Sequence, residues 1–464
     1  MDVKGKRVLI VGLARSGTAA CEELVKLGAK VTVTDIKKED ELKDAIKKLE
    51  GKDVKFVLGN HPLSLLEDVD LIVTSPGVPM DIELLEKARE KRVPIISELE
   101  LGFWFNKAPI IAVTGTNGKT TTTTLIGEIL KNDGKNISVA GNIGIPFIQE
   151  ADRIGVKDYI VLEVSSFQLE NIINFKPKIA VILNITEDHI NYHKTFENYI
   201  KAKSRIFENQ TEEDYLILNY DDPIVFSLSK FARSKIVYFS RKTELNQGVF
   251  VKNGVIVIKE HDKILPILKA KEVGIKGLHN LENALASVAA CWAAGTNLNA
   301  MAETLKDFKG VEHRLEYVDT VDGVKFINDS KGTNPDAAIK ALEAIDDPII
   351  LIAGGYDKNA DFKPFVRAFF GRVKKVILIG QTADKIERTA KEEGFYQVEK
   401  ASSMQEAVIK AKNSAIAGDT VLLSPACASW DMFKNFEERG KVFKEAVYSL
   451  KEKMVASNKN MKIP

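Results

Sequence analysis

The sequence predicts an α/β protein built on parallel β-sheets, and two observations support this fold class. Short apolar runs such as Val8–Val11 and Ile110–Val113 lead into glycine-containing turns, which are followed by stretches with helical periodicity. The same alternation begins again near Val311. Strands that alternate with helices are typical of parallel sheets. The 464 residues correspond to about two to four domains, at roughly 100–200 residues each.

The composition is that of an ordinary globular protein, with 45% hydrophobic and 28% charged residues. The 66 Lys and Arg residues nearly balance the 65 Asp and Glu residues, so we expect no general affinity for nucleic acid or membrane surfaces. Three cysteines without paired spacing argue against a disulfide framework and fit a reducing compartment. The sequence shows no signal-peptide pattern and no apolar run of about 18 residues, so we expect a cytoplasmic protein without membrane insertion.

The N-terminal elements place polar residues at strand ends. Three strands are expected here: Val8–Val11, Val31–Thr34 and Leu71–Thr74. The first leads into the turn Gly12–Gly17 and a helix from about Thr18 to Leu27, the second ends at Asp35, and the third ends in Ser75–Gly77. Ligands of parallel sheets bind beyond the carboxyl ends of the strands, so a site is expected where these residues meet.

The turn Gly12–Gly17 is similar to a dinucleotide-binding fingerprint, with Asp35 placed as the partner of a ribose. Ala14, however, stands where the middle glycine would let the backbone approach a pyrophosphate. This difference weakens the case for NAD. A related pose of a nucleotide diphosphate remains open, as does a tight turn without a ligand.

The strongest local motif is Gly115-Thr116-Asn117-Gly118-Lys119-Thr120, between an apolar strand and a threonine-rich helix start. Glycines let backbone N–H groups turn toward phosphate oxygens, and the helix N-terminus favours negative charge. Lys119 can reach the β- and γ-phosphates, and the Thr120 hydroxyl can coordinate Mg²⁺. Val113 occupies the place of the usual first glycine, so a chance glycine turn is the alternative.

Three further side chains are candidates for metal or catalytic chemistry. Glu163 ends an apolar strand and is well placed to hold Mg²⁺, and a surface or helix-capping carboxylate is the alternative. His189 follows another strand end, where it could be a ligand or a bystander. Lys203 lies in the amphipathic helix Tyr199–Phe207, where position alone predicts an ordinary solvated lysine.

The remaining elements continue the alternation. A hairpin is expected over Gly248–Ile258, because Asn253-Gly254 suits a type I′ turn, and a helix is expected from about Leu281 to Ala294. The other expected strands are Tyr159–Leu162, Ile179–Leu183, Lys325–Ile327, Ile349–Ile352, Val376–Ile379 and Val421–Leu423.

Taken together, these motifs resemble the Mur ligase family. The segments that carry the resemblance occur in the family's order and are Gly115–Thr121, Glu163–Glu170, Asn184–His189, Lys203, Gly277–Asn283, His313-Arg314 and Asn328–Lys331. The stretch Leu423–Gly440 is similar to the members that add D-glutamate. The chain lacks the DNPR motif that marks members adding diaminopimelate or lysine, and it has Asn117 where the alanine-adding members usually have His.

The resemblance implies three domains: residues 1–98, a Rossmann-like domain for the UDP end of a substrate; 99–310, a P-loop domain for ATP; and 311–464, a Rossmann-like domain for the amino acid. It implies an ATP-dependent ligase that adds D-glutamate to UDP-N-acetylmuramoyl-L-alanine through an acyl phosphate, with Mg²⁺, in peptidoglycan precursor synthesis. We expect a monomer that binds no nucleic acid.

The resemblance also implies residue roles. Catalysis is assigned to Lys119, Glu163, His189 and Lys203, and metal binding to Thr120, Glu163, His189 and a carbamylated Lys203. ATP binding is assigned to Gly115, Thr116, Asn117, Gly118, Lys119, Thr120, Thr121, Asn283, Arg314, Asp329 and Lys331. Substrate binding is assigned to Ala14, Arg15, Ser16, Asp35, Ser75, Gly77, Asn142, Thr333, Lys358, Ser429 and Phe436.

Other activities remain open at this point. Another amide ligase of the superfamily, of the Mur or folate-polyglutamylating type, would share the phosphate loop. An NAD-dependent oxidoreductase would use the first domain but would leave the loop at Gly115 unexplained. A non-catalytic P-loop regulator would bind or hydrolyse a nucleotide without forming an amide.

Overall fold

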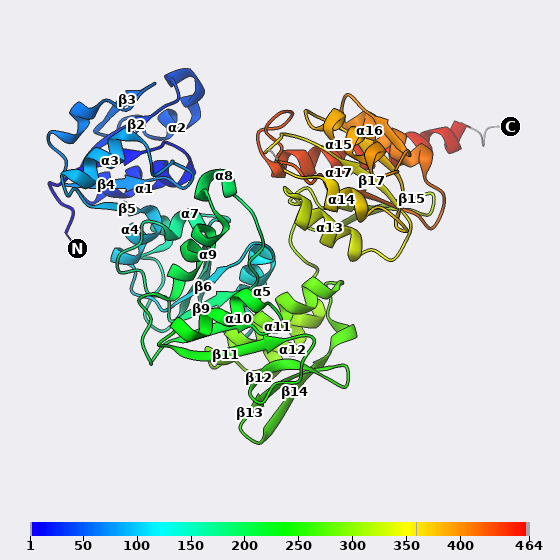
Figure 1. Ribbon diagram of the computed structural model, residues 1–464, viewed down its shortest axis with the longest axis horizontal. Helices are drawn as coiled ribbons and strands as arrows, with labels where there is room; N and C mark the ends of the chain where they lie inside the picture. The colour runs from blue at the N-terminus through cyan, green and yellow to red at the C-terminus, as the bar shows by residue number, and fades with distance from the viewer. Residues whose placement is uncertain (1, 359, 461–464) are drawn as a thin grey trace. The chain divides into compact units, whose positions relative to one another are not determined.

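The strands of the described residues, 2–358 and 360–460 of this computed structural model, form three β-sheets (Figure 1). Parallel pairs dominate each sheet and helices connect them, which confirms the predicted α/β class. The chain divides into two compact units, Met1–Val273 with Leu281–Phe308 and Gly274–Asn280 with Lys309–Pro464. Because the first two sheets share a unit, the predicted boundary at residue 98 stays a prediction.

The first sheet has the order β3-β2-β1-β4-β5 and is parallel throughout. Its strands are β1 (Arg7–Val11), β2 (Lys30–Asp35), β3 (Val54–Leu58), β4 (Leu71–Thr74) and β5 (Ile95–Ser97). Its helices are α1 (Arg15–Lys26), η1 (Glu39–Glu41), α2 (Lys43–Lys48), η2 (Leu63–Leu66), α3 (Glu83–Glu90) and α4 (Glu98–Phe105). The order reverses beside β1, so the turn after β1 lies at the topological switch point, where such sheets bind ligands.

The central sheet has nine strands in the order β14-β13-β12-β11-β10-β9-β6-β8-β7. The strands are β6 (Ile110–Thr114), β7 (Ile137–Gly141), β8 (Tyr159–Glu163), β9 (Ile179–Ile182), β10 (Tyr215–Asn219), β11 (Lys235–Ser240), β12 (Gly248–Lys252), β13 (Val255–Glu260) and β14 (Lys263–Lys269). Asn253 (φ 48°) and Gly254 (φ 75°) turn β12 back into antiparallel β13, which confirms the predicted hairpin.

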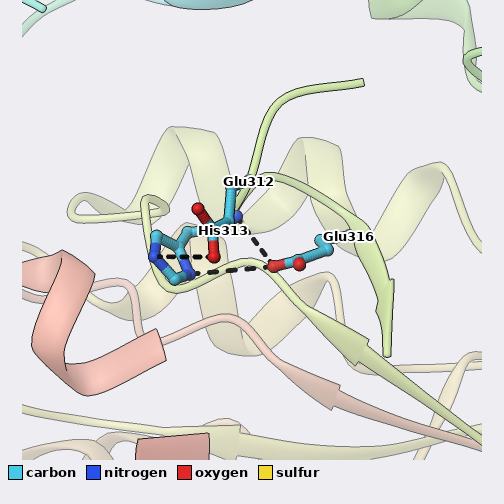
Figure 2. Close-up of side chains that lie close together, drawn as sticks. All are labelled: Glu312, His313 and Glu316. Carbon is cyan, nitrogen blue, oxygen red and sulfur yellow. Dashed lines mark hydrogen bonds and ion pairs between the residues drawn. The ribbon is translucent and has the colours of Figure 1, made fainter. Parts of the chain in front are cut away.

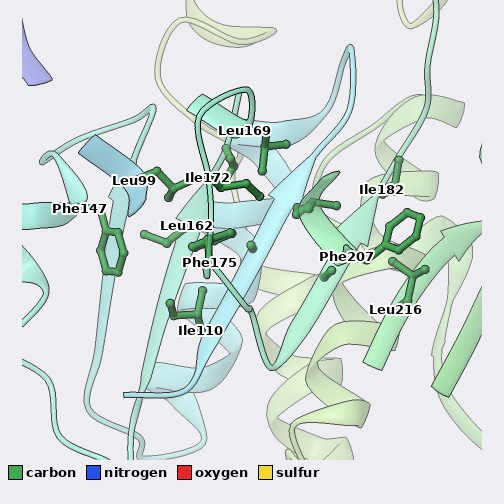
Figure 3. Close-up of a cluster of buried hydrophobic side chains, with 14 of the residues drawn as sticks. Leu99, Ile110, Phe147, Leu162, Leu169, Ile172, Phe175, Ile182, Phe207 and Leu216 are labelled. Carbon is green, nitrogen blue, oxygen red and sulfur yellow. The ribbon is translucent and has the colours of Figure 1, made fainter. Parts of the chain in front are cut away.

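Helices cover the central sheet, and apolar side chains fill the space between. Leu162, Ile182 and Leu216 point from their strands into one buried cluster with Phe147 and Phe207 (Figure 3). Strands buried on both faces read as continuous apolar runs, which is why they could be located in the sequence. The helices are α5 (Lys119–Asn132), α6 (Phe147–Glu150), α7 (Ser166–Leu169), α8 (Ile190–His193), α9 (Phe196–Ser204), η3 (Arg205–Phe207), α10 (Pro223–Ser227), η4 (Leu228–Phe231), η5 (Ala270–Glu272), α11 (Leu278–Ala293) and α12 (Leu298–Asp307).

The third sheet has the order β15-β16-β20-β17-β18-β19, with only the β15–β16 pair antiparallel among the described strands. Its strands are β15 (Glu316–Val321), β16 (Val324–Asn328), β17 (Ile349–Ala353), β18 (Val373–Leu378), β19 (Val398–Lys400) and β20 (Thr420–Leu423). Its helices are α13 (Pro335–Glu343), α14 (Lys363–Arg367), α15 (Ala383–Glu392), α16 (Met404–Ser414) and α17 (Phe436–Asn460). Among the described helices, none is long and apolar enough to cross a membrane.

Candidate active site

The phosphate loop joins β6 to α5, and its two glycines are required by its geometry. Gly115 (φ 152°) and Gly118 (φ 85°) both lie in the backbone region that favours glycine. A Cβ on Gly118 would stand 2.2 Å from Asn283 Oδ1, and one on Gly115 would stand 3.1 Å from Leu183 Cβ. The loop therefore presents the N–H groups at the start of α5 to an anion. Asn283, from α11, lies directly against it.

Neighbouring segments hold the loop in place. Lys119 folds back and donates from Nζ to the carbonyls of Gly115 (2.9 Å) and Thr116 (2.8 Å), which keeps its positive charge at the loop. The Asn117 N–H donates to Asn184 Oδ1 (2.9 Å), and Asn184 returns a bond to the Asn117 carbonyl (3.1 Å). Because Asn184 follows β9, the strand beside β6, two strand ends jointly position the loop.

Thr120, Glu163 and Asn142 form one hydrogen-bonded chain beside the loop. The strand register pairs Val113 with Glu163, which places this carboxylate at the carboxyl end of β8 next to the start of α5. Thr120 Oγ1 donates to Glu163 Oε2 (2.7 Å), and Asn142 Nδ2 donates to Glu163 Oε1 (2.9 Å). Glu163 is buried. A hydroxyl and a carboxylate in contact at a phosphate loop form an oxygen donor pair suited to Mg²⁺.

Lys203 is one of the most deeply buried side chains of the chain. It is 2% exposed, and Nζ donates to the carbonyl of Gly115 (2.7 Å) while lying 4.7 Å from the centre of the Tyr199 ring. Burial, together with the charge of Lys119, lowers the pKa of this amine well below its ordinary value, although Asp188 and Glu163 act in the opposite direction. The structure thus overturns the reading of Lys203 as a solvated lysine.

His189 lies at the N-terminus of α8 with a positive φ of 55°, an uncommon conformation for a non-glycine residue. Its ring packs edge-on against Phe167 (4.8 Å between centres), and its Nε2 lies 3.6 Å from Asp188 Oδ2. The centre of the Tyr199 ring lies 6.5 Å from that of His189. Tyr199 therefore lies near both His189, which precedes α8, and Lys203, which lies with Tyr199 in α9.

A cavity with a volume of about 660 Å³ lies at the carboxyl end of the first sheet. Of the predicted substrate residues, it is lined by Ala14, Asp35, Ser75 and Gly77. The Asp35 carboxylate accepts from the N–H groups of Leu13 (2.7 Å) and Lys37 (2.9 Å), so it organises the turn after β1. Ser75 Oγ donates to the Gly12 carbonyl (2.7 Å).

The other two residues predicted in that turn, Arg15 and Ser16, are not among the residues that line the cavity. Ser16 is half-buried in the first turn of α1. Arg15 is exposed and donates to the carbonyl of Asn142 (3.2 Å), which ties the turn to the central sheet within the same unit.

In the second unit, the predicted nucleotide residue Asp329 follows β16 and is buried. Oδ2 accepts from Ser424 Oγ (2.8 Å), and Oδ1 accepts from the Leu315 N–H (3.3 Å). Burial raises the pKa of this carboxyl to about 6, against the lowering effect of Arg314. The charge of Arg314 thus acts on Asp329, and the assignment of both residues to ATP stays a prediction.

Of the predicted amino-acid residues, Thr333, Lys358 and Ser429 lie in loops of this unit, and Phe436 begins α17. Lys358 Nζ lies 5.6 Å from the Trp430 ring centre, and Lys331 Nζ lies 5.2 Å from the Phe436 ring centre. Ser429 is buried, and its carbonyl accepts from the Phe433 N–H (2.8 Å). The Thr333 N–H donates to the Lys331 carbonyl. A half-buried lysine such as Lys358 and a hydroxyl such as that of Ser429 suit recognition of a carboxylate.

Glu312, His313 and Glu316 form a cluster in the second unit (Figure 2), with ligand atoms within 4.8 Å of one another. Lys444 pairs with both carboxylates, at 2.9 Å from Glu316 Oε1. Asn328 Nδ2 lies 2.9 Å from His313 Nδ1 and 3.0 Å from Glu316 Oε2. The Lys444 ammonium therefore supplies the positive charge that a metal ion would bring, and the cluster fixes the segment that carries Arg314.

Several residues of these sites were not predicted from the sequence. Arg439 is 1% exposed and binds four oxygens, which belong to Ser330 Oγ (3.0 Å), the Ser330 carbonyl (2.7 Å) and the carbonyls of Cys427 and Ala428. It thereby joins the loops after β16 and β20 to the start of α17. Asn184 and Asp188 follow β9, and that strand-end position is the signal that could have indicated them.

Comparison with known proteins identifies three matching domain descriptions along the chain. Residues 6–97 match the Mur ligase MurD-like N-terminal domain, 113–291 the Mur ligase middle domain, and 313–427 the Mur ligase glutamate ligase domain. These three ranges fall one on each sheet.

Two relatives named UDP-N-acetylmuramoylalanine--D-glutamate ligase illustrate the similarity. The one from Thermoanaerobacter sp. (strain X514) is 52% identical over 97% of this chain and 100% of its own length. The one from Clostridioides difficile (strain 630) is 48% identical over the same shares. Among solved structures, UDP-N-acetylmuramate-alanine ligase from Thermotoga maritima matches with a TM-score of 0.61 at 21% identity. The match covers 96% of this chain and 99% of that chain, and it shows a similarity of fold.

Proposed function

This chain belongs to the Mur ligase family, and on that premise we propose that it is the ATP-dependent ligase that joins D-glutamate to UDP-N-acetylmuramoyl-L-alanine in peptidoglycan precursor synthesis. One observation carries the assignment: relatives with that name are 48–52% identical to the chain over 97% of its length. The phosphate loop with its Thr120–Glu163 pair agrees with it. An NAD-dependent oxidoreductase would have no use for this phosphate loop.

The first step transfers a phosphoryl group. A carboxylate oxygen of the muramoyl-alanine substrate attacks the γ-phosphorus of ATP, the bond from that phosphorus to the bridging oxygen breaks, and ADP leaves with the electron pair. The product is an acyl phosphate. Two anions must approach each other, so positive charge has to be fixed where they meet. Lys119, held at the loop by the carbonyls of Gly115 and Thr116, supplies it.

Mg²⁺ fits the residues beside the loop. The Thr120 hydroxyl and the Glu163 carboxylate would hold it, because both offer oxygens and already lie in contact. Asn142 keeps Glu163 oriented by its bond to Oε1. When bound, the ion neutralises charge that develops on the phosphate oxygens.

Lys203 is proposed to act as a carbamate. Burial lowers the pKa of this amine, which favours the neutral form that attacks CO₂. The nitrogen lone pair forms an N–C bond, and the nitrogen loses one proton to solvent. The product carries a carboxylate-like pair of oxygens, so a residue that cannot bind Mg²⁺ becomes an oxygen donor beside Glu163 and Asp188. His189, near Tyr199, is proposed to orient the substrate carboxylate with Asn142.

The second step forms the amide. The neutral amine of D-glutamate attacks the acyl carbon, a tetrahedral intermediate forms, and phosphate leaves with the C–O electron pair while the nitrogen loses a proton. Lys358, Thr333, Ser429 and Phe436 are proposed to bind D-glutamate. Arg314, Asp329, Lys331 and Asn283 are proposed to bind ATP. The cavity at Ala14, Asp35, Ser75 and Gly77 is proposed to hold the UDP end.

An isotope experiment tests the acyl phosphate. The substrate is prepared with ¹⁸O at both oxygens of the alanine carboxylate. It is then turned over with ATP and D-glutamate in unlabelled water. We expect one ¹⁸O atom in each released phosphate, because the bridging oxygen of the acyl phosphate leaves with phosphorus. Amide product accompanied by unlabelled phosphate would contradict this mechanism.

A further inference from the structure

The cavity of the first sheet contains a residue for which no role was predicted, His61. It follows β3 and lines the cavity together with the apolar side chains Ile36, Leu42 and Ala45. Ile36 is 66% exposed, which is unusual for a residue next to a buried strand. Charged side chains, among them Lys37, Glu41 and Asp44, line the same cavity. An apolar side with one nearby polar ring is suited to a planar base that makes a directed hydrogen bond.

A short hydrogen-bond chain fixes the tautomer of His61. Thr34 Oγ1 lies 3.0 Å from the Asn60 carbonyl and 3.0 Å from His61 Nδ1. A carbonyl only accepts, so the Thr34 hydroxyl hydrogen points to Asn60. The Thr34 oxygen can then only accept from the ring, and Nδ1 must carry the hydrogen. In a neutral imidazole, this leaves the lone pair on Nε2.

The ring is neutral near pH 7, and its Nε2 is available. Burial lowers the pKa of His61 below its ordinary value, against the opposing charge of Asp35. Within residues 2–358 and 360–460, Nε2 of His61 has no hydrogen-bond partner. This atom is also not among the fully buried polar atoms that lack a partner. His61 therefore offers the cavity one acceptor and no donor.

The position of His61 matches the base end of a nucleotide. In such sheets the diphosphate lies at the glycine turn and the ribose near the acidic end of the second strand. Here these places are Gly12–Gly17 and Asp35, and His61 lies one strand further out, after β3.

We propose that His61 is a specificity-determining residue that selects uracil by accepting the N3–H of the base through Nε2. The inference rests on the proposed function and extends it to the choice of nucleotide. Uracil carries a hydrogen on N3, whereas cytosine presents a lone pair there. Cytosine would place two acceptors against each other, and a site built to bond one hydrogen rejects the analogue that lacks it.

Calorimetric titration of the full-length protein with UDP and with CDP tests this, with the phosphate loop kept saturated by Mg²⁺ and a non-hydrolysable ATP analogue. We expect the wild type to prefer UDP by about 10-fold or more. His61→Phe should bind UDP about 10-fold more weakly and CDP equally well, so the preference disappears. His61→Asn, which keeps an acceptor, should retain part of it. His261→Phe changes an exposed histidine of the same unit and should leave both affinities unchanged.

A second measurement does not depend on any variant. Nitrogen-15 NMR of the wild type should show His61 as the neutral Nδ1–H tautomer, and UDP should shift its Nε2 resonance. An Nε2–H tautomer, or an undiminished UDP preference in His61→Phe, would overturn the proposal. If the wild type makes the D-glutamate product while either of these results is found, only the role of His61 fails. If it neither binds UDP nor makes product, the proposed function fails as well.

Discussion

Lys203 Nζ donates to the carbonyl of Gly115 across 2.7 Å, although 88 positions separate them in the sequence. A buried amine thus lies directly beneath the phosphate loop, near Lys119, Glu163 and Asp188. An ordinary ammonium here would add positive charge next to Lys119 without offering an oxygen to a metal. The carbamate of Lys203 remains a proposal, and the burial of this amine near Lys119, Glu163 and Asp188 supports it.

We therefore expect Lys203→Ala to lose activity by about 10²–10³-fold in kcat, the range for removing one preorganised group that stabilises a transition state. Added acetate should restore part of the activity, because a free carboxylate can supply the missing oxygens. Steady-state ADP release with and without acetate measures both effects.

Lys201→Ala provides the matched control, since Lys201 is exposed on the same helix. It should keep near-native turnover and show no response to acetate. A fully active Lys203→Ala enzyme, or a loss of activity on which short carboxylates have no effect while the fold is intact, would contradict the carbamate.

Lys119→Ala should lower kcat by about 10²–10³-fold, because its charge is needed as negative charge shifts on the transferred phosphoryl group. Lys131→Ala, which changes an exposed lysine in the last turn of the same helix, should have little effect. Thermal unfolding of both variants checks their folds. Near-native turnover in a folded Lys119→Ala enzyme would show that chemistry occurs elsewhere.

The strands and the loops at their ends could be predicted because their signals are local. The strand Leu71–Thr74 was placed at its observed bounds, and Val8–Val11 differs from β1 by one residue. Weaker edge strands such as β3, with the half-exposed sequence Val54–Leu58, were missed because they lack a continuous apolar run.

The burial of Lys203 and Arg439 could not be predicted from local pattern. Lys203 contacts one backbone carbonyl, and three of the four oxygens that Arg439 binds are backbone carbonyls. A carbonyl has no sequence signature. Helical periodicity placed Lys203 on a polar face, yet its Nζ is buried against the Gly115 carbonyl in the loop after β6. Resemblance to a family, rather than periodicity, indicated the residue.

Glu98 should make the stability of the protein depend on pH. Burial raises its pKa from 4.5 to about 7, and Oε2 has no hydrogen-bond partner within residues 2–358 and 360–460. The folded state holds a proton here that the unfolded state releases above pH 4.5. Stability is therefore lost as pH rises from about 4.5 to 7, by at most about 3 kcal/mol.

Glu98→Gln should remove this loss, because an amide oxygen can still accept from the Ile148 N–H. Urea unfolding at pH 5 and pH 8 measures the difference between the variant and the wild type. Glu100→Gln is the contrasting control: Glu100 accepts from the N–H groups of Ile173, Asn174 and Phe175, so that change should destabilise at both pH values. An identical pH slope in Glu98→Gln and wild type would refute the assignment.

Lys358→Ala should raise KM for D-glutamate by about 10–100-fold with a smaller change in kcat, the range for losing a hydrogen bond to a charged group. KM for ATP should not change. Lys363→Ala, an exposed lysine of the same unit, serves as the control. Initial rates at varied D-glutamate give the constants, and an unchanged KM for D-glutamate would remove Lys358 from the amino-acid site.

The choice of D-glutamate is tested by measuring ADP release together with product detection by mass spectrometry. The assay uses UDP-N-acetylmuramoyl-L-alanine and a panel of amino acids. We expect D-glutamate to support ADP release with one amide product per ADP, while L-glutamate, L-lysine and diaminopimelate give neither. Equal turnover with L-lysine or diaminopimelate, or ADP release without any amide product, would contradict it.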